Sequence, residues 1–338
     1  MRSLRLLAMN ARRRVKVCAA WSALALLGCE GPLSTLTPAG QGAERIARMF
    51  WWMAGGTIVI WLAVVGLAVY AVFVAPKRHA GKAARRLIVV GGVAVPVVVL
   101  TGLLIYGLAS LPPLMAPAPD GSLTVLVTGE QWWWRVRYRV PGHDPVELAN
   151  EIVVPVGEPV EFHLDSHDVI HSFWIPSLGG KVDMIPGHRT RLTLEPTEIG
   201  VFRGVCAEYC GTSHAWMGFS VMVLAQEHFA HWLARQAEPA RSPSEPLAIR
   251  GQESFIVNGC GACHTIRGTA AQGVVGPDLT HVGSRNTLAA GLLDNSPNAF
   301  WRWIAYTNEL KPGVYMPAFG MLPSDDLQAL AAYLESLQ

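Results

Sequence analysis

Residues 205–217 read VCAEYCGTSHAWM. This segment spaces two cysteines, a histidine and a methionine as C-x3-C-x3-H-x2-M, with Cys206, Cys210, His214 and Met217 at the four positions. Thiolate, imidazole and thioether groups are the soft and borderline ligands that suit copper. A further histidine, His171, lies upstream in the segment HDVIHSFWIP, close to the start of an expected strand. The stretch therefore predicts a copper site carried by a β domain.

Other sites also use these residue types. Two cysteines outside the cytoplasm usually form a disulfide, although only three residues separate this pair. Zinc is bound by cysteine and histidine, and a mononuclear blue-copper site uses one cysteine, two histidines and a weak methionine. Two cysteines, two histidines and one methionine match none of these sets cleanly. They fit a dinuclear centre in which two thiolates bridge two copper ions.

The runs around this loop are short and rich in β-forming residues. LTVLVTG, WWWRVRYRV, EIVVPV, PVEFHLD and RLTLE alternate or run apolar, with Pro, Gly and Asp between them. Such spacing predicts a β-sandwich or barrel, which we place at residues 115–235. His163 and His167 lie near His171 but outside the motif, and we interpret both as ordinary polar residues of a strand or loop.

Two uncharged stretches, residues 49–75 and 87–114, precede the β domain. Each exceeds the roughly 20 residues that a helix needs to cross a bilayer. The loop between them contains Lys77, Arg78, Lys82, Arg85 and Arg86, and basic loops stay in the cytoplasm. The pattern predicts a two-helix transmembrane hairpin in a bacterial inner membrane, with everything that follows on the periplasmic side. Only 15% of the residues are charged, against roughly 25% in soluble proteins, which argues against a wholly soluble chain.

The first residues are typical of a targeting segment. Several arginines precede a short apolar run that ends in Leu-Leu-Gly28-Cys29. This end resembles a bacterial lipoprotein cleavage box, which implies a signal peptide at residues 1–28 and lipid on Cys29. A plain signal anchor with a bystander cysteine is the alternative. Cys18 lies inside the targeting segment on either interpretation.

A second redox module follows a segment rich in Pro, Ser and Ala at residues 236–249, which predicts a flexible, extended linker. Cys260, Cys263 and His264 then form the C-x2-C-H signature of covalent haem c. The segments GPDL at 276–279 and YMPAF at 315–319 resemble the other landmarks of class I cytochromes c. The resemblance implies an all-α cytochrome c domain at residues 250–338, with Met316 as the sixth iron ligand and Met321 and His281 as weaker candidates.

The cysteine motif, His171, the hairpin and the tract GEQWWW at 129–134 together resemble cytochrome c oxidase subunit II over roughly residues 45–225. The resemblance implies a cupredoxin-like fold that holds the dinuclear copper centre CuA. It implies that His171, Cys206, Cys210, His214 and Met217 bind copper through their side chains, and that Glu208 binds it through its backbone carbonyl. The Glu208 carboxylate would help hold Mg²⁺ at the junction with subunit I. Trp132, Trp133 and Trp134 would assist electron transfer into the centre, or would simply be sandwich core.

The resemblance implies subunit II of a haem–copper terminal oxidase. Electrons would pass from haem c through CuA to haem in subunit I, where oxygen is reduced to water. Subunit I and subunit III would be partners, and a soluble or membrane cytochrome c or a quinol–cytochrome c reductase would be the donor. Two alternatives are the electron-accepting subunit of a CuA-containing nitric oxide reductase and a copper-binding assembly lipoprotein. The haem signature argues against the latter, because a copper carrier gains nothing from a haem.

One position departs from the family pattern. The second span of the best-known relatives carries a Glu and a Trp before its proline, and the Glu helps to admit protons. Aligned on Pro96, these positions are Val89 and Gly92 here. The sequence therefore predicts that protons for this enzyme use subunit I or another route, or that proton uptake is altered, and it leaves the class of oxidase open.

Overall fold

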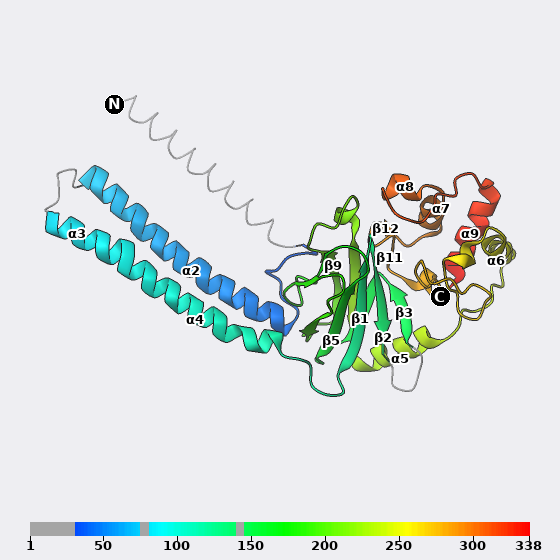
Figure 1. Cartoon of the computed structure of the whole chain (residues 1–338), viewed down its shortest axis with the longest axis horizontal. Coiled ribbons are helices and arrows are strands. Elements are labelled where there is room, and N and C mark those ends of the chain that lie inside the picture. Colours follow the sequence, from blue (N-terminus) through cyan, green and yellow to red (C-terminus); the bar gives the residue numbers. More distant parts are fainter. Residues whose placement is uncertain (1–30, 75–80, 140–144) are drawn as a thin grey trace, which may run out of the picture.

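The structure is a computed structural model that describes residues 31–74, 81–139 and 145–338. The expected signal segment, Cys18, the predicted lipidation site Cys29 and the loop residues Lys77 and Arg78 lie outside the described residues. The described chain forms a helical hairpin, a two-sheet β sandwich and a C-terminal helical domain, with the sandwich between the other two parts (Figure 1). This architecture confirms the predicted fold class.

Two long helices form the hairpin. The first joins α2 (Gln41–Val69) to the π-helical turn η2 (Tyr70–Val74), and the second joins α3 (Gly81–Val89), the π-helical turn η3 (Val90–Ala94) and α4 (Val95–Met115). By length and composition both can cross a membrane, and their most apolar windows are not buried within the chain. Large apolar side chains such as Trp52 and Phe73 are 74% and 78% exposed. A bilayer provides the apolar surroundings that such a surface needs.

The base of the hairpin is bonded to the sandwich. The first N–H groups of a helix have no partner within the helix, and here Gln41 donates to the carbonyl of Glu195 at 3.0 Å and Ala43 to that of Leu178 at 3.2 Å. Gly40 permits this approach, because a Cβ there would lie 2.7 Å from the Leu178 oxygen. After the second helix, the Ala116 carbonyl accepts from Thr193 Oγ1 at 2.9 Å. The sandwich is therefore attached directly to both helices (Figure 1).

The sandwich consists of two five-stranded sheets with strand orders β3-β2-β1-β5-β8 and β4-β10-β9-β6-β7. The strands of the first are β1 (Leu123–Glu130), β2 (Trp133–Tyr138), β3 (Val146–Ala149), β5 (Val160–Ser166) and β8 (Thr190–Leu194). Those of the second are β4 (Glu151–Pro155), β6 (His171–Trp174), β7 (Val182–Met184), β9 (Gly200–Cys206) and β10 (Gly218–Leu224). Strands β1 and β5, and likewise β4 and β10, pair in parallel, and the other pairs are antiparallel.

Aromatic residues fill the space between the sheets. Phe173 and Phe219 stack with ring centroids 4.9 Å apart, and Trp134 packs edge-on against Phe219 at 5.2 Å. All three side chains are buried. Gly204 makes room for the Phe219 ring, because a Cβ there would overlap it. This core lies directly beneath the predicted copper ligands and holds β6, β9 and β10 in place.

The C-terminal domain contains α6 (Pro246–Val257), α7 (Pro297–Ala305), α8 (Thr307–Leu310) and α9 (Ser324–Ser336). Short 3-10 turns η5 (Cys260–Ala262) and η6 (Val282–Ser284) and the hairpin β11 (Thr287–Leu288) and β12 (Leu293–Asp294) connect them. Helices α6 and α9 cross closely at Gly251, where a Cβ would lie 2.0 Å from the Ala329 carbonyl oxygen. Leu327, Leu330 and Leu334 of α9 are buried in the domain core.

The connection between the domains differs from the flexible linker that composition predicts. Helix α5 (Gln226–Ala237) extends into it and packs Trp232 on Tyr138 of the sandwich at 5.4 Å. The Gln236 carbonyl accepts from Arg267 at 2.7 Å, and the Glu238 carbonyl lies 3.0 Å from His281 Nε2. The first part of the segment is thus bonded to the C-terminal domain, because its backbone carbonyls meet donors there, which a compositional argument does not consider.

Candidate functional site

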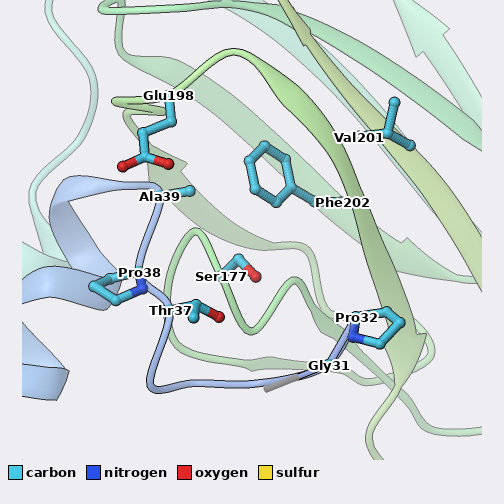
Figure 2. A pocket seen from close by; sticks show the side chains of 9 residues that line it. All are labelled: Gly31, Pro32, Thr37, Pro38, Ala39, Ser177, Glu198, Val201 and Phe202. Atoms are coloured by element: carbon cyan, nitrogen blue, oxygen red, sulfur yellow. The ribbon is translucent and has the colours of Figure 1, made fainter.

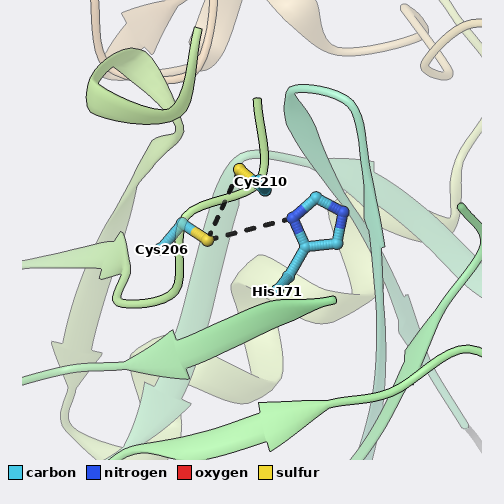
Figure 3. A group of neighbouring side chains, drawn as sticks. All are labelled: His171, Cys206 and Cys210. Carbon is cyan, nitrogen blue, oxygen red and sulfur yellow. Dashed lines mark hydrogen bonds between the residues drawn. The ribbon is translucent and has the colours of Figure 1, made fainter. Parts of the chain in front are cut away.

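Three of the predicted copper ligands converge at one end of the sandwich. His171 begins β6, Cys206 ends β9 and Cys210 lies in the loop that follows, so that their ligand atoms are all within 4.8 Å of one another. Cys206 Sγ is 3.8 Å from both Cys210 Sγ and His171 Nδ1 (Figure 3). All three side chains are buried, and both cysteines are free thiols. The cluster therefore offers two sulfur ligands and one imidazole to a soft metal ion.

The remaining predicted ligands surround the same two sulfurs. His214 Nδ1 lies 3.5 Å and Met217 Sδ 3.7 Å from Cys210 Sγ. The backbone carbonyl oxygen of Glu208 lies 3.2 Å from Cys206 Sγ. Each sulfur consequently has its own imidazole, the thioether lies on the Cys210 side, and the carbonyl lies on the Cys206 side. Two shared sulfurs with different outer ligands suit two metal ions better than one.

The two thiols cannot lose both protons easily without a cation. The hydrogen bond with Cys210, aided by the one with His171, lowers the pKa of Cys206 to about 4. The hydrogen bond with the Cys206 thiolate, followed by burial, raises the pKa of Cys210 above its ordinary value. The pair therefore shares one proton, which a bound metal ion would displace.

A carboxylate orients His171. Asp168 Oδ1 accepts from His171 Nε2 at 2.8 Å, and Asp168 Oδ2 accepts from the backbone N–H of Gln131 at 2.7 Å. Because a carboxylate only accepts, Nε2 carries a proton, and Nδ1 is the ring nitrogen that a metal ion beside Cys206 would use. Gly129 makes room for the ring, since a Cβ there would lie 2.7 Å from His171 Cδ2.

The three tryptophans occupy different environments. Trp134 is buried in the core, and its Nε1 donates to the Met217 carbonyl at 3.3 Å. Trp133 is half-buried and stacks with Arg135, whose guanidinium lies 4.7 Å from the ring centroid. Trp132 donates from Nε1 to the Cys210 carbonyl at 3.0 Å. Trp132 and Trp134 are therefore both bonded to the cysteine loop (residues 206–217), Trp132 at the cysteine ligand Cys210 and Trp134 at Met217.

The histidine of the haem signature is arranged to bind iron. His264 Nδ1 donates to the Pro277 carbonyl at 2.9 Å, which leaves the Nε2 lone pair free. Burial lowers the pKa of His264, so the ring is neutral. Gly276 provides the space, because a Cβ there would lie 2.5 Å from His264 Cε1. The GPDL segment thus supports the His264 ring at two points. Together with the free thiols of Cys260 and Cys263, this histidine fits a covalent haem.

The candidates for the sixth ligand differ in environment. Met316 is half-buried and packs against the core of the C-terminal domain, whereas Met321 is 78% exposed. His281 is engaged with the Glu238 carbonyl. These environments favour Met316 as the sixth ligand of the haem iron.

We call the group formed by His171, Cys206, Cys210, His214 and Met217 the sulfur cluster. The other two histidines near His171 in the chain lie apart from it. His163 Nε2 is 2.7 Å from Glu161 Oε1 on the same strand. His167 donates its backbone N–H to the Gly129 carbonyl at 3.0 Å.

Comparisons with known proteins agree with both sites. The family described as cytochrome C oxidase subunit II, periplasmic domain, matches residues 140–224, and the cytochrome c family matches residues 248–338. A cytochrome c oxidase subunit 2 from Alkalihalophilus pseudofirmus is 34% identical over 93% of this chain and 94% of its own length. The chain belongs to the cytochrome c oxidase subunit II family. It is therefore a subunit of an oxidase complex, with a cytochrome c domain fused at its C-terminus.

Two further members of the cytochrome c oxidase subunit II family are similar over shorter stretches. The subunit 2 of Bacillus sp. strain PS3 is 33% identical over 72% of this chain and 70% of its own length. The solved periplasmic domain of subunit II from Bradyrhizobium japonicum is 32% identical and covers 36% of this chain and 96% of its own, with a TM-score of 0.33.

Sequence reasoning missed the roles of three residues that support the sites of this oxidase subunit. Asp168 and Gly129 act on His171, and the only signal for them is their position beside the motifs that contain His171 and the tryptophans. Lys311 of the C-terminal domain is 1% exposed and donates to the Trp132 carbonyl at 2.7 Å. Burial lowers the pKa of Lys311 to about 7. Nothing in the local sequence distinguishes Lys311 from a surface lysine.

A surface pocket of this oxidase subunit lies away from both sites. It is formed where residues 31–39 pass the start of β9, with Thr37, Ser177, Glu198 and Phe202 among its lining residues (Figure 2). Its lining, as far as the described residues show, includes no cysteine, histidine or methionine. We therefore assign it no part in electron transfer.

Proposed function

We propose that this chain accepts electrons at a covalent haem c, passes them to a dinuclear copper centre and delivers them to haem in subunit I, where oxygen is reduced to water. The observation that carries the proposal is the sulfur cluster. Two buried cysteine sulfurs 3.8 Å apart, each with its own imidazole, lie next to a domain that bears the haem signature. The name of the Alkalihalophilus relative supports oxygen as the final acceptor.

His171, Cys206, Cys210, His214, Met217 and the Glu208 carbonyl would hold copper, and Cys260, Cys263, His264 and Met316 would hold haem. When bound, these groups supply one-electron redox chemistry. The scaffold would hold the ligands in one geometry in both oxidation states. Asp168 fixes the tautomer of His171, and the aromatic core beneath fixes the strands, so little has to move when an electron arrives. That property suits a carrier rather than a hydrolase.

The proposed partners are subunit I and subunit III in a bacterial inner membrane, with a cytochrome c or a quinol–cytochrome c reductase as donor. The Glu208 carboxylate is proposed to help hold Mg²⁺ at the junction with subunit I. Val89 and Gly92 lie at the end of α3 and in η3, and neither carries an ionisable group. We therefore propose that proton uptake uses another subunit.

Metal analysis of the oxidase purified with this chain tests the copper assignment. We expect two coppers on this chain per covalent haem, measured as the difference from a complex with both cysteines replaced by serine. The variant Gly129→Ala should lose most of this copper, because its Cβ would displace the His171 ring. Gly200→Ala is the matched control, since a Cβ there meets only Phe202 at an ordinary 3.4 Å. A single copper with an intense blue absorption band would contradict the dinuclear assignment.

We further propose that the mature chain begins at Cys29 and carries lipid there, because Leu-Leu-Gly28-Cys29 follows a basic and apolar segment. Mass spectrometry of the membrane-extracted protein should find a diacylglycerol-modified Cys29 and no peptide from residues 1–28. Cys29→Ser should remain unprocessed or lack the lipid mass. An intact Met1 in the mature protein would refute lipidation.

A further inference from the structure

Lys311 is a buried cation between the two domains. Its side chain follows α8, is 1% exposed, and donates from Nζ to the Trp132 carbonyl at 2.7 Å and to the Ala289 carbonyl at 3.0 Å. No carboxylate of the described residues lies within ion-pair distance of it. An apolar residue would pack here with less desolvation. The hydrogen bonds to these two carbonyls therefore account for a lysine at position 311.

The residues that follow Lys311 contact the β sandwich, which carries the proposed copper ligands. The Pro312 carbonyl accepts from Ser213 Oγ at 2.6 Å, within the cysteine loop. A Cβ at Gly313 would lie 2.9 Å from the Trp132 ring, and Gly313 has a φ of +83° that favours glycine. Val314 packs against the sandwich core. We call residues 311–315 the docking loop, and the proposed iron ligand Met316 follows it directly.

A second segment of the C-terminal domain contacts the backbone next to the proposed copper ligand Met217. The carbonyl of Ala290 accepts from the backbone N–H of Gly218 at 3.1 Å, and Gly218 is the residue after Met217. Ala289 and Ala290 have φ values of +55° and +65°, which non-glycine residues adopt only when their surroundings hold them there. Lys311 holds the Ala289 carbonyl, so one ammonium group joins this segment, the docking loop and Trp132.

We infer that Lys311 is a positioning residue that docks the cytochrome c domain on the copper domain, with the docking loop as a fixed connection between Met316 and Trp132. Trp132 in turn donates to the Cys210 carbonyl at 3.0 Å. The docked domain covers Trp132, which is 6% exposed. An external donor consequently reaches the C-terminal domain and not the tryptophan. This consequence for electron transfer rests on the proposed function, whereas the docking itself does not.

Hydrogen–deuterium exchange on the assembled oxidase tests the docking without using redox activity. Lys311→Met removes the donor and leaves two buried carbonyls unpaired. The Gly218 amide and the amides of the docking loop should then exchange at least tenfold faster. Lys181→Met is the matched control, because Lys181 is exposed and its ion pair with Asp183 lies on the surface. Unchanged exchange in Lys311→Met would overturn the inference.

A second variant and a rate complete the test. Lys311→Gln keeps a hydrogen-bond donor without the charge, so its exchange rates should fall between those of the native protein and those of Lys311→Met. If Lys311→Met fails to assemble, exchange at the native rate in Lys311→Gln overturns the inference. Electron transfer from haem to copper should slow at least tenfold in Lys311→Met, with the haem and copper spectra unchanged. If copper is absent from the native chain, the proposed function fails while the exchange result still decides the docking.

Discussion

Haem reduction by an added donor should stay fast when Met217 is replaced by leucine, whereas re-oxidation of that haem through the oxidase should slow by orders of magnitude. Met217 is buried with its Sδ 3.7 Å from Cys210 Sγ. Leucine conserves volume, so the sandwich keeps its packing, but it removes the thioether. Loss of a group that only supports a ligand already costs roughly 10- to 100-fold in metal affinity or activity, and Met217 is proposed as a ligand.

Stopped-flow absorbance of the haem, followed during reduction and then after addition of oxygen, separates the two steps. Met222→Leu is the matched control, because Met222 lies in strand β10, which begins directly after Met217, and packs against the same core without contacting the sulfur cluster. It should behave like the native protein in both steps. If Met217→Leu re-oxidises its haem at the native rate, electrons bypass the sulfur cluster and the proposed order of transfer is wrong.

Replacing Met316 by leucine should lower the haem potential by a large share of the roughly 0.8 V range over which axial ligands tune it. A thioether opposite histidine raises the potential of haem iron, and leucine has no lone pair to offer. The sulfur-to-iron charge-transfer band should disappear, and electron acceptance from the donor should slow. The copper signal in electron paramagnetic resonance should remain unchanged, because none of the sulfur-cluster residues is altered.

Met321→Leu provides the control for this potential. Met321 is 78% exposed and stands five residues after Met316 in the same segment. Redox titration should find the native potential and the native charge-transfer band in this variant. Loss of the band in Met321→Leu, with its retention in Met316→Leu, would assign the sixth ligand to Met321.

Ligands that lie close together in the chain were predictable from spacing. Cys206, Cys210, His214 and Met217 occupy one loop, and short loops bring such residues together in almost any compact fold. Cys260, Cys263 and His264 are likewise contiguous. The hairpin was predictable because its composition leaves the helices no polar face. These features depend on local chemistry, which the order of residues contains directly.

His171 marks the limit of such reasoning. It stands 35 residues before Cys206 and meets it because β6 and β9 pair with Phe173 opposite Cys206. The motif suggested His171, but the strand register delivers its ring to the sulfur. The roles of Asp168 and Gly129 could not be predicted for the same reason, since they appear only once the position of the His171 ring is known.

The sequence by itself determined the two ligand loops, the apolar helices and the β character of the domain between them, because each follows from residue types at short spacing. Only the tertiary structure decided how the two redox domains meet. Lys311 reaches the Trp132 carbonyl across 179 residues of chain, and residues 236–240 lie bonded to the C-terminal domain instead of forming a free linker. Such contacts depend on which buried carbonyls remain without a donor after each domain has folded, and no local pattern of residues encodes that.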